Sequence, residues 1–188
     1  MNCQSENRFS LRRMAESDLE MVMNWRMQPD VTKYMNTDPV LTLEGQKKWF
    51  ERVKANSDVR YWIIEVDSKP AGVFNLDGIN STDGQIHYAY YVGEKTLRSI
   101  SLAISLEMSM YDYVFEVLGK TSVYADVFTA NRGVIALHEL CGGKVTEILK
   151  DHVEKNGKKY DVAVVITNKS DWEEAKKDAE YEKIDFGA

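Results

Sequence analysis

The sequence is poor in cysteine and in long apolar runs, and each shortage excludes a class of protein. Its two cysteines, Cys3 and Cys141, are too few for a disulfide framework in a chain of 188 residues. No apolar run approaches the roughly 20 residues that a membrane span requires, and the N-terminal segment lacks the apolar stretch of a signal peptide. We therefore expect a cytoplasmic protein without a membrane partner.

Proline and glycine are too sparse to mark a linker. Only three prolines occur and the glycines are dispersed, with no internal repeat. This pattern favours a single domain over residues 1–188. Within it we expect residues 1–58 to supply a strand and two helices, 60–128 the central strands and a long helix, 129–167 a helix and a hairpin, and 168–188 a charged tail.

Negative charge exceeds positive charge, with 30 acidic against 24 basic residues and a net charge of −6. A nucleic-acid partner would favour a basic face, so we expect none. No histidine pair and no Cys-x-x-Cys segment has the spacing of a metal site, so we expect no metal. Part of the acidic excess lies in residues 171–185, which we interpret as a solvated helix face.

Hydrophobic periodicity and turn signals predict an α/β fold with a mixed sheet. Residues 17–20 have the Ser-x-x-Glu spacing of a capping box, which starts a helix that ends before Pro29. Asn156-Gly157 is typical of a hairpin turn. The expected strands cover 9–13, 60–66, 71–77, 85–92, 121–128, 144–154 and 158–167. The expected helices cover 17–27, 42–55, 99–118 and 131–142.

The most informative segment follows Val92, where a strand ends, a short loop follows and a long helix begins near Ser99. Free backbone amides at a helix start bind anions, helped by the helix dipole. The small side chains of Ser99, Ser101 and Ala103 let a phosphate group approach the backbone, and Arg98 adds positive charge to the loop. The segment therefore predicts a phosphate-binding turn, with an ordinary capped helix as the alternative.

Two motifs resemble those of the GNAT N-acetyltransferase superfamily. Residues 98–103 are similar to its Gln/Arg-x-x-Gly-x-Gly/Ala loop, and residues 131–142 to its Asn-x6-Tyr/His-x3-Gly helix. The order and spacing of the elements agree with the family over nearly the whole chain. Ser101 stands where the family usually has glycine, so its side chain is either tolerated beside the pyrophosphate or donates a hydrogen bond to it.

The resemblance implies a mixed, mostly antiparallel central sheet with helices on both faces and a splayed cleft for acetyl-CoA. The cleft would open between the strand that ends at Val92 and the strand that starts near Thr121. One strand edge would bind the pantetheine arm, the turn after it would bind the pyrophosphate, and Asn131 of the later helix would contact the cofactor near its pantetheine. The cofactor-binding residues would be Tyr90, Tyr91, Val92, Arg98, Ser99, Ile100, Ser101, Leu102, Ala103 and Asn131.

Two histidines are the acid and base candidates. The family places a tyrosine or histidine near the thioester sulfur at the position of His138, which implies that His138 protonates the leaving thiolate. Asn131 and His138 are seven residues apart and share a helix face. His87 is a candidate base, because a neutral imidazole accepts a proton from an attacking amine. Asp77 and Glu65 compete for that role.

The first helices resemble a branch that acetylates nucleotide-linked amino sugars, including the pseudaminic-acid pathway enzyme, and more loosely the ribosomal-protein N-terminal acetyltransferases. This resemblance implies that residues 23–31 and 42–50 form one wall of the acceptor site. There Trp25 would pack against a sugar or base, Arg26 would pair with a phosphate, and Asn75 would hydrogen-bond the acceptor. A core tryptophan covered by its neighbouring arginine is the alternative.

The sequence thus predicts an acetyl-CoA-dependent N-acetyltransferase that acts on a primary amine, foremost that of a nucleotide-linked amino sugar. A peptide N-terminus as the acceptor and a non-catalytic CoA-binding module are the alternatives. The expected partners are the small-molecule amine and acetyl-CoA as co-substrate, and a homodimer stays open.

Overall fold

The computed structural model describes residues 7–187, and in this range seven strands form one sheet in the order β1-β2-β3-β4-β5-β7-β6. The β4–β5 pair is parallel and the other neighbouring pairs are antiparallel, which confirms the predicted mixed, mostly antiparallel sheet. The prediction for Cys3 lies outside the described residues. The strands are β1 (Phe9–Arg13), β2 (Val59–Val66), β3 (Lys69–Asp77), β4 (Gln85–Val92), β5 (Ser122–Phe128), β6 (Lys144–Lys155) and β7 (Lys158–Asn168).

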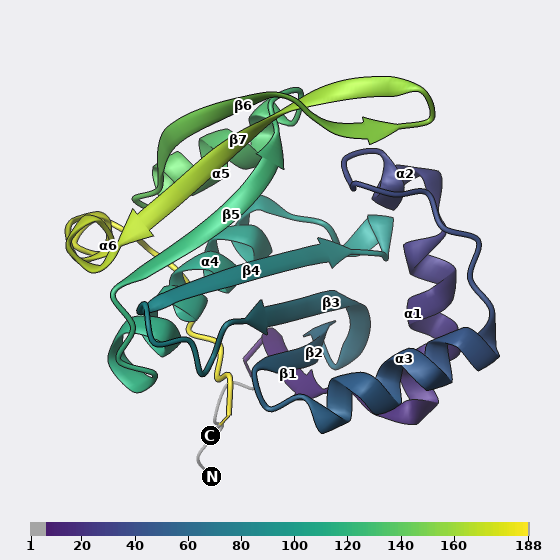
Figure 1. The fold of residues 1–188 in the computed structure, drawn as a ribbon. Coiled ribbons are helices and arrows are strands. Elements are labelled where there is room, and N and C mark those ends of the chain that lie inside the picture. The colour runs from purple at the N-terminus through teal and green to yellow at the C-terminus, as the bar shows by residue number, and fades with distance from the viewer. Residues whose placement is uncertain (1–6, 188) are drawn as a thin grey trace, which may run out of the picture.

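Helices pack on both faces of this sheet, as expected (Figure 1). The larger core joins the sheet to α4, α5 and α6 and includes Phe74 and Leu106, whereas the smaller core joins it to α1 and α3 and includes Leu19 and Phe50. On the side of α1 and α3, Figure 1 shows β4 and β5 uncovered, and Ala89 in the middle of β4 is exposed. The helices are α1 (Leu19–Arg26), α2 (Pro29–Thr32), α3 (Leu43–Ala55), α4 (Ile100–Asp112), α5 (Arg132–Leu140) and α6 (Lys169–Lys176).

The parallel pair separates soon after it forms. β4 and β5 pair from Gln85 opposite Ser122 to His87 opposite Tyr124, and there the pairing ends. Both strands nevertheless continue, β4 to Val92 and β5 to Phe128. The two strands therefore splay apart, which confirms the predicted separation of these strands.

The capping box predicted for residues 17–20 is wrong. A 3₁₀ turn (Glu16–Asp18) precedes α1, and the Asp18 carboxylate accepts a hydrogen bond from the backbone N–H of Ala15 at 2.8 Å. Arg12, on the neighbouring strand β1, donates to both carboxylate oxygens of Asp18 at 2.7 and 2.8 Å. Asp18 caps this turn in place of Ser17, because its carboxylate accepts both the backbone N–H of Ala15 and a bidentate contact from Arg12. A serine hydroxyl cannot accept a bidentate contact.

The long helix predicted for residues 99–118 changes its winding near the end. The α-helical part, α4, ends at Asp112, and a π-helical turn continues from Tyr113 to Val117. Gly119 then adopts a positive φ of 65°, which is the left-handed conformation typical of a helix C-terminus. The predicted helical extent is therefore correct, and the wider last turn is not visible in the periodicity.

The charged segment predicted for residues 168–188 begins with a helix that has exposed charged residues, as expected, but the segment also packs on the domain. Trp172 of α6 is buried, and the chain after it packs along α4, where Ile184 and Phe186 are 2% and 3% exposed. Phe186 stacks on Tyr113, and its carbonyl oxygen accepts a hydrogen bond from Trp62 at 3.0 Å. The charged residues between these anchors face solvent, so the tail is part of the domain.

Candidate functional site

The splayed strands present two unpaired edges to the cleft. After His87, the edge of β4 that faced β5 has lost its partner, and β5 after Tyr124 has lost its partner on the same side. Free backbone N–H and C=O groups at such edges accept an extended ligand as an added strand. The region from Tyr90 to Val92, predicted to bind a pantetheine arm, lies on this free edge.

The two tyrosines of that edge point to opposite faces. Tyr90 stacks on Phe74 with ring centroids 5.6 Å apart, and its hydroxyl points toward Glu107 at 3.4 Å. Burial raises the pKa of Tyr91, which lies on the other face near Tyr61. Both rings are committed to packing, so the backbone is the part of this strand edge that is available to a ligand.

The turn before α4 has the features of an anion site. Ser99 is the N-cap of α4, and its hydroxyl accepts the backbone N–H of Leu102 at 3.1 Å. The N–H of Ala103 donates to the carbonyl of Ser99 at 3.2 Å. Within residues 7–187, the backbone N–H groups of Ser99, Ile100 and Ser101 make no hydrogen bond, so these three are the available donors. The prediction that all residues from 98 to 103 offer amides is therefore too broad.

Arg98 is turned toward its own loop. Its Nε donates to the carbonyl oxygen of Val92 at 2.9 Å, and its guanidinium lies 4.0 Å from the Asp30 carboxylate. Lys95 pairs with the same aspartate at 2.9 Å. Arg98 thus fixes the loop between β4 and α4, and its positive charge remains close to the free amides of the turn.

The second motif supplies a free amide side chain and a buried histidine. Asn131 is the N-cap of α5, but its side chain makes no capping hydrogen bond, so it is available to a ligand. His138, two turns later, is 3% exposed. Its Nδ1 lies 2.9 Å from the Tyr88 hydroxyl and 3.0 Å from Glu107 Oε1. Its Nε2 makes no hydrogen bond to any residue between 7 and 187.

Sequence reasoning missed Glu107, which lies on α4 and is fully buried. It accepts hydrogen bonds from the hydroxyls of Tyr88 at 2.8 Å and Tyr111 at 3.1 Å, in addition to its contact with His138. The available signal was its place in the sequence, because a single acidic residue interrupts the apolar face of a helix between Leu106 and Met108. A charged residue at such a position needs a partner.

His87 lies on the face of β4 opposite to Tyr88 and His138, because the side chains of neighbouring strand residues point in alternate directions. Its ring packs against Tyr124 at 4.9 Å. Burial lowers the pKa of His87, while Asp126 and Asp77 act in the opposite direction. The imidazole is therefore neutral at pH 7 and able to accept a proton.

A hollow of about 380 Å³ lies beside His87, on the uncovered face of the sheet. Asp77 and Asp126 are exposed and flank it, and hydrogen bonds from the Gln85 N–H and from the Ser81 hydroxyl lower the pKa of Asp83 at its rim. No lysine or arginine stands among the lining residues that the structure describes. The lining consists of Asp77, Gly78, Ser81, Asp83, Gln85, His87, Tyr124 and Asp126.

The predicted acceptor residues are only partly brought together. Trp25 is 3% exposed, and its indole N–H donates to Glu94 at 2.8 Å, so the ring belongs to the core and does not face a ligand. Arg26 donates to the hydroxyl of Thr37 at 2.9 Å. Asn75 is half-buried on β3 and shares a face with Asp77 and His87. The prediction for Trp25 is therefore wrong, because its hydrogen bond holds it inside.

Neither Glu65 nor Cys141 is available to the reaction. Glu65, a competing base, pairs with Arg12 at 2.8 Å on the far strand pair β1–β2. Cys141 lies one turn beyond His138, but burial raises the pKa of its thiol to about 12. A neutral, buried thiol does not act as a nucleophile.

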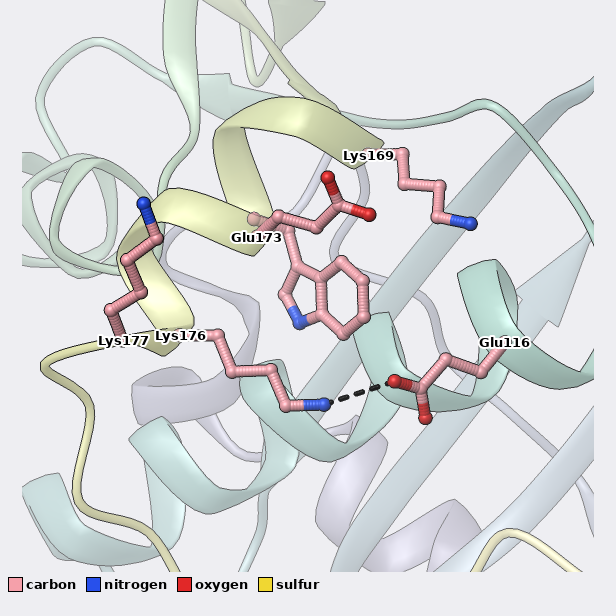
Figure 2. A pocket seen from close by; sticks show the side chains of 6 residues that line it. Glu116, Lys169, Glu173, Lys176 and Lys177 are labelled. Carbon is pink, nitrogen blue, oxygen red and sulfur yellow. Dashed lines mark hydrogen bonds and ion pairs between the residues drawn. The ribbon is translucent and has the colours of Figure 1, made fainter.

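A separate hollow of about 340 Å³ lies between α6 and the π-helical turn (Figure 2). Figure 2 shows Lys176 reaching across it to Glu116, with a separation of 3.1 Å. The ammonium of Lys176 also lies 2.8 Å from Asp112 and above the Trp172 ring. These ion pairs tie α6 to α4, and we assign the hollow a structural role.

Within the described part of the chain, no group of three or more histidine, cysteine, aspartate or glutamate residues has the geometry of a metal site. None of the helices there has the length and apolar character to cross a membrane.

The comparisons with known proteins agree with this geometry. The model of the acetyltransferase (GNAT) domain family matches residues 8–144. No curated protein matches the sequence significantly. The spermidine N-acetyltransferase of Vibrio cholerae, solved in complex with CoA and spermine, superposes with a TM-score of 0.81 at 20% identity, over 88% of this chain and 98% of that chain.

Two further solved structures are similar. The dodecameric structure of the Vibrio cholerae spermidine N-acetyltransferase in an intermediate state has a TM-score of 0.75 at 19% identity, over 88% of this chain and 96% of that chain. A putative acetyltransferase has a TM-score of 0.74 at 18% identity, over 89% of this chain and 86% of that chain. At these identities the similarity to solved structures establishes the fold alone. The match to the family model covers most of the chain and therefore establishes the family.

Proposed function

The chain belongs to the GNAT acetyltransferase family, and from that premise we propose that it moves the acetyl group of acetyl-CoA to a primary amine of a small cationic molecule. The observation that carries the choice of acceptor is the hollow beside His87. Its charged lining is acidic, and it opens on the face of β4 that an amine would approach. A protonated amine is attracted by about 1 kcal/mol per carboxylate at 4 Å in water.

The cleft residues fit the co-substrate. Its pyrophosphate would be held by the free backbone amides of Ile100 and Ser101, and its pantetheine arm by the open edge of β4 and the free side chain of Asn131. Acetyl-CoA supplies an acetyl group on a thioester. In the transfer, a C–N bond to the amine forms and the C–S bond breaks.

The reaction removes a proton from the amine nitrogen and adds a proton to the leaving sulfur. The two histidines lie on opposite sides of β4, so each could serve one of these transfers. His87 is on the acceptor face and would take the proton from the attacking nitrogen, directly or through water. His138 is on the α5 side and would give a proton to the leaving sulfur. Asp77 shares the face of His87, and its exposed carboxylate would bind the cationic acceptor.

A nucleotide-linked amino sugar is the second candidate acceptor, and Arg26 is the residue that favours it. Its guanidinium bonds to Thr37 and has no carboxylate within 4.0 Å among residues 7–187. An unpaired arginine near α2 suits a diphosphate. The acidic hollow argues against this acceptor, because it would repel the same diphosphate.

The test is an acetyl-transfer assay that follows the free thiol of CoA across four acceptors. These are a polyamine, a short diamine, the monoamine of equal chain length, and a nucleotide-linked amino sugar, with a basic peptide N-terminus as a fifth arm. We expect kcat/KM for the diamine to exceed that for the monoamine by about tenfold, and the difference to shrink as salt screens the carboxylates.

Two results would contradict the proposal. Preference for the sugar nucleotide would replace the cationic acceptor and restore the role of Arg26. Absence of thiol release with every acceptor, in a protein that binds acetyl-CoA, would favour the non-catalytic module.

A further inference from the structure

Glu107 is buried without a lysine or arginine partner. None of the ion pairs within residues 7–187 joins it to a basic side chain other than His138, whose Nδ1 lies 3.0 Å from Oε1 and 3.1 Å from Oε2. Glu107 is fully buried and His138 nearly so. A buried acid is costly unless it is paired and hydrogen-bonded, so the imidazole is the partner that makes this position tenable.

The hydroxyl protons around Glu107 determine which histidine nitrogen carries a proton. Tyr88 has one hydroxyl proton, and it is directed at Glu107 Oε2, 2.8 Å away. The same hydroxyl oxygen therefore presents a lone pair to His138 Nδ1 at 2.9 Å. Nδ1 thus faces a carboxyl group and a hydroxyl lone pair, both acceptors, and only a protonated Nδ1 satisfies this arrangement.

We propose that Glu107 is a positioning residue that holds His138 with its proton on Nδ1 and leaves Nε2 as the nitrogen that exchanges a proton with the reacting sulfur. The proposal rests on the proposed function for the role of His138, and it adds the residue that sets its tautomer. The charged ring, which the carboxyl group stabilises, gives its Nε2 proton to the leaving thiolate and so becomes the neutral ring with its proton on Nδ1. Nε2 of the neutral ring is then an acceptor, which takes up a proton from solvent before the next transfer. Glu107 itself touches no substrate and acts through the ring.

The other ionisable side chains around His138 and Glu107 stay protonated. Tyr88 and Glu107 contact His138 directly, and the hydroxyls of Tyr90 and Tyr111 point to Glu107 in turn. Cys141 lies one turn further along the same helix as His138. Burial and the charge of Glu107 raise the pKa of each of the three tyrosines, and burial first and Glu107 second raise that of the cysteine. The three tyrosines and the cysteine therefore stay protonated near neutral pH and take no proton from the imidazole.

The first test uses the free protein and requires no turnover. Two-bond 1H–15N correlation spectra of histidine rings separate a protonated from an unprotonated ring nitrogen, and His138→Asn identifies the signal. We expect neutral His138 to have its proton on Nδ1, and Glu107→Gln to shift the ring toward the other tautomer. A neutral ring protonated on Nε2 in the unmodified protein would overturn the proposal.

The second test is a double-mutant cycle with kcat as the readout. Glu107→Gln should lower kcat by about 100-fold, within the range of acid–base contributions, and leave KM for acetyl-CoA within about twofold. In the His138→Asn background the same change should alter kcat by less than about twofold, because a residue that acts through the ring has nothing left to position. An equal loss in both backgrounds, or no loss in either, would overturn the proposal.

Asp112→Asn is the matched control. Asp112 is a second buried acid on α4, but it pairs with Lys176 and Tyr181 and does not touch His138. It should lower stability without changing kcat or the histidine spectrum. If Glu107→Gln does not fold, the tautomer measured in the unmodified protein still decides the matter. Absence of turnover in the unmodified protein would count against the proposed function alone, since the tautomer is read independently.

Discussion

His87 and Tyr124 form the last cross-strand pair between β4 and β5, and their rings lie 4.9 Å apart where the two strands begin to separate. The cleft therefore opens beside a titratable ring. One residue further along β4, Tyr88 points to the opposite face and touches His138. Strand alternation thus places one histidine on each side of the strand edge that would carry the thioester.

The free amides at the start of α4 predict that a negative charge placed there raises the stability of the free protein and lowers its affinity for CoA. Ser101→Asp adds negative charge at a helix N-terminus, which stabilises the free protein by about 0.3–1 kcal/mol. The same carboxylate would repel a pyrophosphate, so the affinity for CoA should fall by about tenfold or more. Thermal melts with and without CoA measure both effects.

Ser101→Ala is the control, because it keeps the backbone amide and removes only the hydroxyl. It should leave CoA affinity within about twofold. A large loss of affinity in Ser101→Ala would assign the binding to the hydroxyl and contradict a site built from backbone amides.

The acidic hollow predicts a charge effect specific to the acceptor. Asp126→Asn should raise KM for a diamine by about fivefold to tenfold and leave KM for acetyl-CoA unchanged, since each carboxylate is worth about 1 kcal/mol to a nearby cation. Steady-state kinetics measure this. Asp67→Asn removes the same charge at an exposed position near Arg8 and should change neither constant. Equal effects of both variants would show that net charge alone matters.

The lowered pKa of His87 predicts a pH dependence. An imidazole acts as a base only in its neutral form, and burial lowers the pKa of His87 below the ordinary 6.5. Its contribution should persist as pH falls to about 6.5 and disappear as pH falls through the lowered pKa. The measurement is the ratio of kcat of the unmodified protein to that of His87→Gln, in which the ionisation of the substrate cancels. A ratio that is constant from pH 5 to 8 would exclude His87 as the base.

The burial of Trp25 predicts a loss of stability without a loss of acceptor binding. Its ring packs so closely on Gly93 that a Cβ there would lie 2.2 Å from the indole, and Trp25→Phe removes the hydrogen bond to Glu94. The free energy of unfolding should fall by about 1–3 kcal/mol, measured by urea titration. An unchanged stability with a raised KM for the acceptor would return Trp25 to the acceptor site.

Features set by neighbouring residues were predictable from the sequence, and features set by distant partners were not. The strand that ends at Val92, the Ser99 cap and the Asn131 start of α5 follow from local chemistry, and the sheet type follows from their order. The burial of Phe186 depends on Trp62, which lies far away in the chain. The role of Glu107 likewise depends on two other elements that only the fold brings to it.

The most direct test of the account is a crystal structure of the protein with CoA. We predict that the pyrophosphate lies on the amides of Ile100 and Ser101, that the pantetheine arm lies between β4 and β5, and that the CoA sulfur comes within about 3.5 Å of His138 Nε2. A CoA molecule outside the splayed strands, or a sulfur on the His87 face of β4, would contradict it.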